Sequence, residues 1–206
     1  MTLTFYCAPM STATLTHLIL EELGVPVEKV KLDIQKGETK TPEYKKINPN
    51  GRVPCVVHDG VAIWESAALT MYLGETFGVE RGLYPPPGTR RGEAMKWIVW
   101  TNASLGDAIS RFTRNTMDWY PAEQRNAAAA EQAKKDVAEY LGVLDGALAD
   151  RPFLTGDYTL ADMHLHSICD WMRHLQIDFK PFAHVNAWGE RCSARPAYQK
   201  IMAAGG

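Results

Sequence analysis

The chain has 206 residues, and 46% of them are hydrophobic, so it is long enough to bury one large core or two modest ones. Its formal net charge of −2, with lysines and arginines spread among the acidic residues, argues against a nucleic-acid or anionic-membrane partner. The longest apolar runs are too short for a membrane span and the first residues lack a signal-peptide pattern, which predicts a cytoplasmic protein.

Strands and helices alternate at the start of the chain. Residues 2–6 have the alternating pattern of a strand, and leucines at helical spacing predict a helix over residues 12–23 that ends at Gly24. Val30, Leu32 and Ile34 then alternate with polar residues as a second strand. Because a helix connects these two strands, we expect them to be parallel with a right-handed crossover.

A short helix and a hairpin follow. Thr41 is positioned to cap a helix that begins at Pro42. Asp59 and Gly60, between two apolar runs, predict a two-residue turn that pairs residues 54–58 with residues 61–64. The next run predicts a helix over residues 67–77 with Ser66 as its N-cap.

A proline-rich stretch at residues 82–88 interrupts this pattern. We therefore expect a domain over residues 1–80, a linker over 81–89 and a second domain over 90–206. The second domain has only helical periodicity, including a helix over 126–148 and one that Thr159 and Asp162 open as a capping box. The predicted fold class is an α/β domain of order βαβαββα followed by an all-α domain.

Neither the cysteines nor the histidines have metal-ligand spacing, so we predict no metal. The cysteines are far apart and form no CxxC pair, which favours free thiols. His164 and His166 are two residues apart and would lie on different faces of a helix, as ordinary packed or exposed histidines do.

The start of the helix after the hairpin is suited to binding a small anion. Glu65 and Ser66 bring a carboxylate and a hydroxyl to a point where free backbone N–H groups and the helix dipole attract a ligand carboxylate. The same residue types are also typical of a capped helix without a ligand, so the pattern leaves both interpretations open.

Taken together, several motifs in order resemble one protein family. The chain has "NPNGRVP" at residues 48–54, "WES" at 64–66, a proline-rich linker and "GDYTLADM" at 156–163 in an all-helical second half. In this it resembles the cytosolic glutathione S-transferase superfamily, bacterial beta- and theta-like members especially. The resemblance implies a thioredoxin-like first domain that binds glutathione as co-substrate, and a helical domain that supplies a groove for an electrophile.

The resemblance also implies which residues hold glutathione. Val53 would offer its main chain to the cysteinyl part, and Pro54 would follow a cis peptide bond. Glu65 would bind the γ-glutamyl ammonium, while Ser66 and the helix N-terminus would bind the α-carboxylate.

A basic residue near the glycine carboxylate is expected in this family. Arg52 occupies that position, and a solvent-exposed loop charge is an equally good interpretation of it. Lys36 and Lys40 are weaker candidates for the same task.

Activation of the thiol requires a hydrogen-bond donor, because a thiol with a pKa of about 8.5 is mostly protonated at neutral pH. Tyr6, Cys7, Ser11 and Thr12 lie near the end of the first strand, and the sequence leaves the choice open. We favour Ser11, with Thr12 as the alternative, because both lie at the N-terminus of the first helix. No cysteine stands at position 12, which argues against a mixed disulfide there.

The electrophile pocket is predicted from residues around the first strand–helix loop and on the first helices of the second domain. These residues are also expected of an ordinary core or interface. They are Met10, Asn102, Ile109, Phe112 and Trp119.

The predicted function is conjugation of the glutathione thiolate to a small hydrophobic electrophile by a homodimeric enzyme. A glutathione-dependent isomerase, dehalogenase or peroxidase on the same fold is one alternative. A non-catalytic binding protein with a related fold is another.

Overall fold

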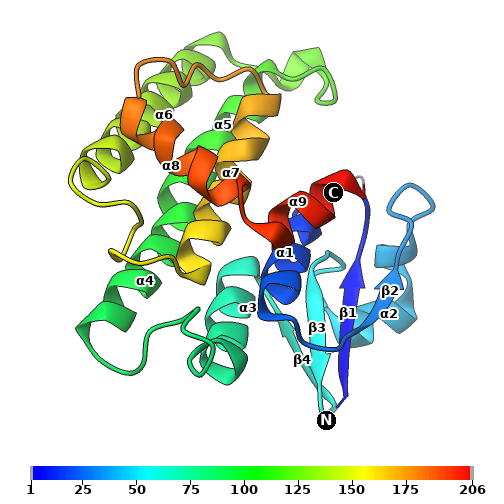
Figure 1. The fold of residues 1–206 in the computed structure, drawn as a ribbon. Coiled ribbons are helices and arrows are strands. Elements are labelled where there is room, and N and C mark those ends of the chain that lie inside the picture. Colours follow the sequence, from blue (N-terminus) through cyan, green and yellow to red (C-terminus); the bar gives the residue numbers. More distant parts are fainter. Residues whose placement is uncertain (1, 205–206) are drawn as a thin grey trace.

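The computed structural model describes residues 2–204, which form a mixed sheet with its helices and a larger bundle of helices (Figure 1). Residues 1 and 205–206, at the outer ends of the two predicted domains, lie outside this range. In chain order the first half contains β1 (Leu3–Cys7), α1 (Ala13–Leu23), β2 (Glu28–Lys31), η1 (Glu38–Lys40), α2 (Pro42–Ile47), β3 (Cys55–His58), β4 (Val61–Trp64), α3 (Ser66–Leu73) and η2 (Gly74–Gly78).

The sheet has the strand order β2-β1-β3-β4. The pair β1–β2 is parallel, as expected for two strands joined by a helix, whereas β1–β3 and β3–β4 are antiparallel. Successive side chains of β1 point to opposite faces: the Phe5 ring lies 6.1 Å from that of His17 on α1, and the Tyr6 ring lies 5.6 Å from that of Tyr44 on α2. Helices α1 and α2 therefore cover opposite faces of the sheet. The predicted α/β fold class is confirmed.

The predicted hairpin is confirmed, and one predicted strand is too long. Asp59 and Gly60 have φ angles of 47° and 85°, the positive values that a type I′ turn requires at both centres. The second strand ends at Lys31, so the prediction that Leu32 and Ile34 belong to it is wrong. Asp33 instead accepts a hydrogen bond from the Lys36 backbone N–H, and this local turn ends the extended run.

Most predicted helix ends are confirmed. Gly24 ends α1 in the left-handed conformation, with φ 62°. Thr41 caps α2 by accepting from the Tyr44 N–H, and Pro42 is the first helical residue. Ser66 is an exception, because Glu65 is the N-cap of α3 and Ser66 is its first residue.

The second half is helical. It contains α4 (Thr89–Trp100), η3 (Thr101–Leu105), α5 (Gly106–Thr116), η4 (Ala122–Gln124), α6 (Ala127–Ala147), α7 (Leu160–His174), α8 (Ala183–Ser193) and α9 (Pro196–Ala203). Helices α4 and α5 form one continuous rod that η3 interrupts as a π-helical turn, a feature common at functional sites. Gly106 packs tightly against this turn, because a Cβ at that position would lie 3.0 Å from the Thr101 carbonyl oxygen.

The predicted capping box anchors α7 in the core. The buried Asp162 carboxylate accepts from the N–H and the hydroxyl of Thr159, from the Leu154 N–H and from the Trp188 indole. Burial raises the pKa of Asp162, while these hydrogen bonds act in the opposite direction. One side chain thereby connects the start of α7, the preceding loop and α8.

The connection between the two halves packs closely against the end of the first half. A Cβ on Gly74 would lie 2.6 Å from the buried ring of Tyr84, so the chain approaches η2 at a distance that only glycine permits. The division into domains at residues 81–89 stays a prediction.

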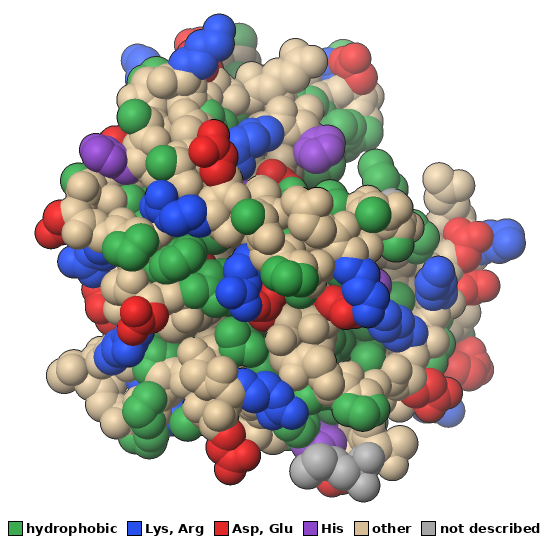
Figure 2. Space-filling view, in the orientation of Figure 1, with side chains coloured by type: hydrophobic (Ala, Val, Ile, Leu, Met, Phe, Trp, Pro, Cys, Tyr) green, Lys and Arg blue, Asp and Glu red, His purple; other side chains and the backbone are tan. Residues whose placement is uncertain are grey.

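Figure 2 shows basic and acidic side chains interspersed on the face that it draws. Among the helices of residues 2–204, none has both the length and the apolar composition of a membrane span.

Candidate functional site

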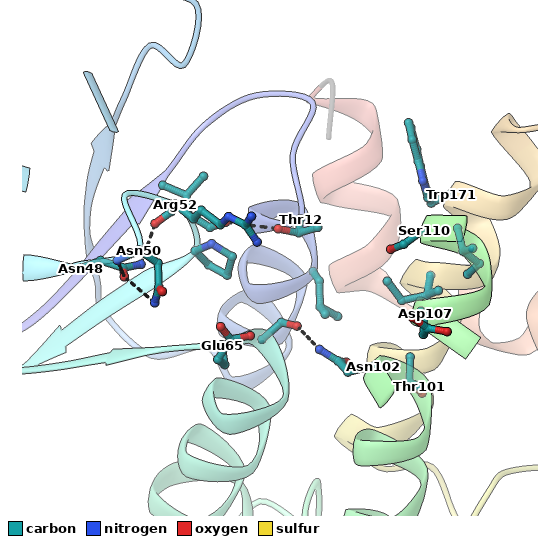
Figure 3. A pocket seen from close by; sticks show the side chains of 17 residues that line it. Thr12, Asn48, Asn50, Arg52, Glu65, Thr101, Asn102, Asp107, Ser110 and Trp171 are labelled. Atoms are coloured by element: carbon teal, nitrogen blue, oxygen red, sulfur yellow. Dashed lines mark hydrogen bonds between the residues drawn. The ribbon is translucent and has the colours of Figure 1, made fainter. Parts of the chain in front are cut away.

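A cavity of about 510 Å³ lies where the first half meets the helical half (Figure 3). We call it the first cavity. Its lining comes from the start of α1, from the loop before β3, from the start of α3, from η3 and α5, and from α7. These residues are Thr12, Leu15, Asn48, Asn50, Arg52, Val53, Pro54, Glu65, Ser66, Thr101, Asn102, Gly106, Asp107, Ile109, Ser110, Ile168 and Trp171.

Hydrogen bonds from buried side chains hold the backbone of the loop before β3. The buried Asn48 donates its side-chain amide to the Arg52 carbonyl at 2.7 Å, and the Tyr44 hydroxyl donates to the same oxygen at 2.7 Å. Gly51 has φ 58°, and a Cβ there would lie 2.7 Å from the Thr39 carbonyl oxygen, so this position requires glycine. The peptide bond between Val53 and its proline is cis, as the family resemblance implies.

The basic candidates near this loop differ in their contacts. The Arg52 side chain is exposed and lines the first cavity. Lys40 donates its ammonium to the Gly51 carbonyl at 2.6 Å, so its charge lies beneath the loop. Lys36 instead pairs with Asp33 at 3.3 Å.

Glu65 and Ser66 line the first cavity at the N-terminus of α3. Glu65 has φ 72° and ψ 120°, a conformation that is strained for a residue with a Cβ. Such strain is concentrated at functional sites, and here it turns the chain from the hairpin directly into the helix. The predicted cap contact of Ser66 is absent among the described residues, which leaves its hydroxyl oxygen to accept from the Asn102 side-chain amide at 2.9 Å.

The two hydroxyls at the start of α1 make different contacts. Ser11 donates to the Ala8 carbonyl at 2.7 Å and accepts from the Ala13 N–H at 3.2 Å, so its side chain closes the first turn of the helix. Thr12 donates to the Val53 carbonyl at 3.2 Å, which is long for a hydroxyl donor. Only Thr12 of the two lines the first cavity.

Tyr6 and Cys7, the other thiol-activating candidates, line neither this cavity nor its neighbour. Tyr6 packs on Tyr44, on the face of the sheet that α2 covers. Burial raises the pKa of Cys7, which favours its neutral thiol.

A second cavity of about 390 Å³ adjoins the first between α1, α7 and α9. The two cavities share Thr12, Leu15, Ile168 and Trp171 as a common wall. The lining of the second cavity combines apolar side chains with hydroxyl groups, one carboxylate and one imidazole. The remaining lining residues are Met10, Ser11, Thr14, Leu18, Ser167, Asp170, His174, Tyr198 and Met202.

The residues predicted for an electrophile pocket are divided between these cavities and the surface. Met10 lines the second cavity and is 89% exposed, whereas Asn102 and Ile109 line the first. Phe112 and Trp119 line neither of them. Trp119 is 59% exposed, and its ring lies 6.4 Å from that of Trp171, just outside the common wall.

Several lining residues were missed by the sequence interpretation. Ile168 and Trp171 lie three residues apart on α7, and this spacing shows a shared helix face but not what that face covers. Asp107 and Ser110 also line the first cavity. Within the described part of the chain no group of three or more His, Cys, Asp or Glu residues is arranged to hold a metal.

Two family models match the sequence. The model described as "Glutathione S-transferase, N-terminal domain" matches residues 1–75, and "Glutathione S-transferase, C-terminal domain" matches residues 102–196. Among curated proteins, "Glutathione S-transferase GstB" of Escherichia coli (strain K12) is 28% identical over 188 residues, covering 90% of this chain and 89% of that protein. "Glutathione S-transferase F10" of Arabidopsis thaliana is 28% identical over 215 residues, covering 98% and 97%.

Solved structures share the whole fold. The glutathione transferase URE2P6 from Phanerochaete chrysosporium, in complex with oxidized glutathione, has a TM-score of 0.89 and 25% identity, covering 99% of this chain and 96% of that one. A glutathione transferase from Methylococcus capsulatus has a TM-score of 0.86 and 28% identity, covering 99% and 98%. These relatives come from bacteria, a plant and a fungus, and they do not single out a beta- or theta-like class.

Proposed function

This chain belongs to the glutathione S-transferase superfamily, and we propose that it binds glutathione in the first cavity and transfers its thiolate to a hydrophobic electrophile in the second. The observation that carries the proposal is the common wall, because Thr12 and Trp171 line both cavities. A thiol held at that wall would face the electrophile directly. Holding two reactants at contact distance lowers the entropic cost of their reaction.

The start of α3 supports binding of the γ-glutamyl end. The Glu65 carboxylate supplies the negative charge that an ammonium requires, and free N–H groups at the helix N-terminus suit a carboxylate. Ser66 adds a hydroxyl to the same point, and Asn102 contacts that hydroxyl from the helical half.

The loop before β3 supports binding of the rest of the tripeptide. Val53 lines the cavity, and its carbonyl, which accepts from Thr12, is an acceptor that a peptide N–H could use. Arg52 is the side chain we propose for the glycine carboxylate. Lys40 adds positive charge beneath the loop, whereas Lys36 is paired with Asp33.

The hydrogen bonds of the two hydroxyls favour Thr12 over Ser11 as the group that activates the thiol. Ser11 uses its proton for the Ala8 carbonyl at 2.7 Å, whereas the 3.2 Å bond from Thr12 to the Val53 carbonyl is weaker and easier to replace. We propose that the cysteinyl N–H of the ligand donates to the Val53 carbonyl in place of the Thr12 hydroxyl. The Thr12 hydroxyl then donates to the sulfur. A donor at the sulfur favours the thiolate, the reactive form.

The test is the pH dependence of conjugation for Thr12→Ala and Ser11→Ala. We expect Thr12→Ala to raise the pKa of bound glutathione by about one unit and to lower the conjugation rate at neutral pH about tenfold. The thiolate absorbance of the complex reports that pKa directly. Thr76→Ala, an exposed site outside both cavities, is the matched control. A lower conjugation rate in Ser11→Ala alone would assign activation of the thiol to Ser11. Unchanged conjugation rates in both variants would contradict activation by a hydroxyl.

The same fold could serve other glutathione chemistry or binding without catalysis. Calorimetry with glutathione and a panel of aryl halides, peroxides and maleyl compounds separates these possibilities. Conjugation of the aryl halide supports the proposal. Turnover of only the other compounds would assign an isomerase or peroxidase, and glutathione binding without turnover would assign a binding protein.

We also propose that two copies of the chain associate as a homodimer. The edge strand β4 exposes Val61 and Trp64, and α4 exposes Met95 and Val99, with exposed fractions between 37% and 64%. Exposed apolar residues of this kind favour a protein interface. Light scattering should give twice the chain mass, and Val99→Glu should reduce it to one chain mass. A single-chain mass for the unaltered protein would contradict the dimer. A cytoplasmic location stays a prediction.

A further inference from the structure

A chain of hydrogen bonds, buried at Thr70 and His164 and exposed where it reaches Ser66, connects the two halves beside the first cavity. The Thr70 hydroxyl lies 2.8 Å from His164 Nδ1, and His164 Nε2 lies 2.8 Å from Asn102 Oδ1. The Asn102 side-chain amide then donates to Ser66 Oγ at 2.9 Å. Thr70 and Ser66 are both on α3, so the chain leaves this helix, passes through α7 and the π-helical turn η3, and returns to it.

His164 has no role in the function proposed above. Its side chain is fully buried and lines neither cavity. Burial lowers the pKa of His164 to about 3, so the imidazole is neutral at physiological pH, with one ring nitrogen that donates and one that accepts.

The contacts determine the direction of every hydrogen bond in the chain. Because the nitrogen of the Asn102 amide faces Ser66, its oxygen faces His164 and must accept, so Nε2 carries the imidazole proton. Nδ1 is then an acceptor, and the Thr70 hydroxyl donates to it. All donors therefore point the same way, from Thr70 toward Ser66.

This direction determines what Ser66 can offer a ligand. Its oxygen already accepts from Asn102, and its own proton has no acceptor among the described residues. Ser66 and Asn102 both line the first cavity, and the dashed line at Asn102 in Figure 3 marks the hydrogen bond between them. The hydroxyl thus presents its proton to the cavity, as recognition of an anion requires, and aligned hydrogen bonds strengthen one another.

We propose that His164 is a positioning residue for carboxylate recognition: it holds the Asn102 amide in the orientation that makes Ser66 a donor toward the ligand. Without the imidazole, the amide is free to turn its oxygen to Ser66. Ser66 would then donate to Asn102 instead of the ligand. This inference rests on the proposed binding of glutathione in the first cavity.

The test compares two ligands that differ in a single carboxylate. Glutathione has the α-carboxylate, and γ-aminobutyryl-cysteinyl-glycine lacks it but keeps the ammonium. We expect His164→Phe to weaken glutathione binding about tenfold and to change binding of the analogue less than about twofold. Calorimetry measures both dissociation constants. His164→Gln, which can place an amide N–H near the position of Nε2, should recover at least half of the loss.

Further variants keep the proposal testable if His164→Phe folds poorly. Asn102→Asp changes an exposed residue and replaces the donating amide with a carboxylate that accepts from Ser66, so it should weaken glutathione binding more than tenfold and the analogue far less. His166→Phe changes a buried histidine outside the chain and should leave both constants unchanged. Thr70→Val should weaken glutathione binding about threefold and leave binding of the analogue unchanged.

Three results would overturn the inference or its premise. Equal weakening of both ligands by His164→Phe would indicate a general structural role. Unchanged glutathione binding in both His164→Phe and Asn102→Asp would show that the chain does not position Ser66. If the unaltered protein binds neither ligand, the proposed function fails and the inference fails with it.

Discussion

The two halves of the molecule contribute to the candidate site in different ways. The sheet half positions its groups through local backbone structure: the cis loop at Val53, and the strained turn at Glu65 that brings the Glu65 and Ser66 side chains to the N-terminus of α3. The helical half contributes side chains held by long-range tertiary contacts, of which Asn102, hydrogen-bonded to His164 and to Ser66, is the clearest case. Groups held by the backbone depend little on the surrounding side chains, whereas groups held by tertiary contacts depend on their packing. The comparison therefore predicts different sensitivities to substitution and to pH.

Acid should destabilise the fold through two buried histidines of the helical half. Burial lowers the pKa of His164 to about 3 and that of His166 to about 4, below the ordinary 6.5, so the unfolded chain binds more protons than the folded one at low pH. The free energy of unfolding should fall as the pH drops below 6.5, by about 2 kcal/mol per histidine between pH 7.5 and pH 5.0. Urea denaturation at the two pH values measures this loss.

The variants His164→Asn and His166→Asn show whether these residues cause the loss. Each substitution should remove about half of the pH dependence of the free energy of unfolding. His184→Asn, at an exposed position, is the control and should leave that pH dependence unchanged. An unchanged pH dependence in both variants would assign the acid sensitivity to other groups.

Glu65→Gln tests the contribution of the sheet half. The amide keeps the shape of the side chain and removes the charge that an ammonium requires, so glutathione binding should weaken about tenfold. Calorimetry measures this, with the exposed Glu80→Gln as a matched control. The Michaelis constant for the electrophile should remain within about twofold, and a comparable rise in it would contradict the separation of the two cavities.

Trp171→Ala tests the common wall from the helical half. Loss of the indole removes apolar surface, so the Michaelis constant for a hydrophobic electrophile should rise about fivefold. Glutathione binding should change less than about twofold, because its polar partners remain. Trp119→Ala is the informative comparison: it should have almost no effect, and an equal rise would restore Trp119 as a pocket residue.

The smallest expected effect is at the rim of the second cavity. Met10 is 89% exposed and has φ 51°, which asparagine tolerates better than methionine. Met10→Asn should raise the Michaelis constant for the electrophile about twofold without destabilising the fold. Steady-state kinetics measures the first quantity and thermal unfolding the second. A tenfold rise would mean that Met10 closes over the electrophile.

Features that depend only on neighbouring residues were predictable from the sequence. The Asp59–Gly60 turn, the Thr41–Pro42 helix start and the Thr159–Asp162 capping box follow from local dihedral preferences and short-range hydrogen bonds, and all three are confirmed. Their order along the chain was enough to indicate the family, which the comparisons confirm.

Contacts between residues far apart in the chain, which complete the candidate site, became known only from the folded structure. The contact between Asn102 and Ser66 spans 36 positions, and the one between His164 and Thr70 spans 94, so no spacing rule predicts them. Helical periodicity showed that Ile109 and Phe112 have partners but not that only Ile109 borders the first cavity. The reason is physical: a side chain's local pattern determines which face of a helix it occupies, whereas packing against another element determines what that face meets.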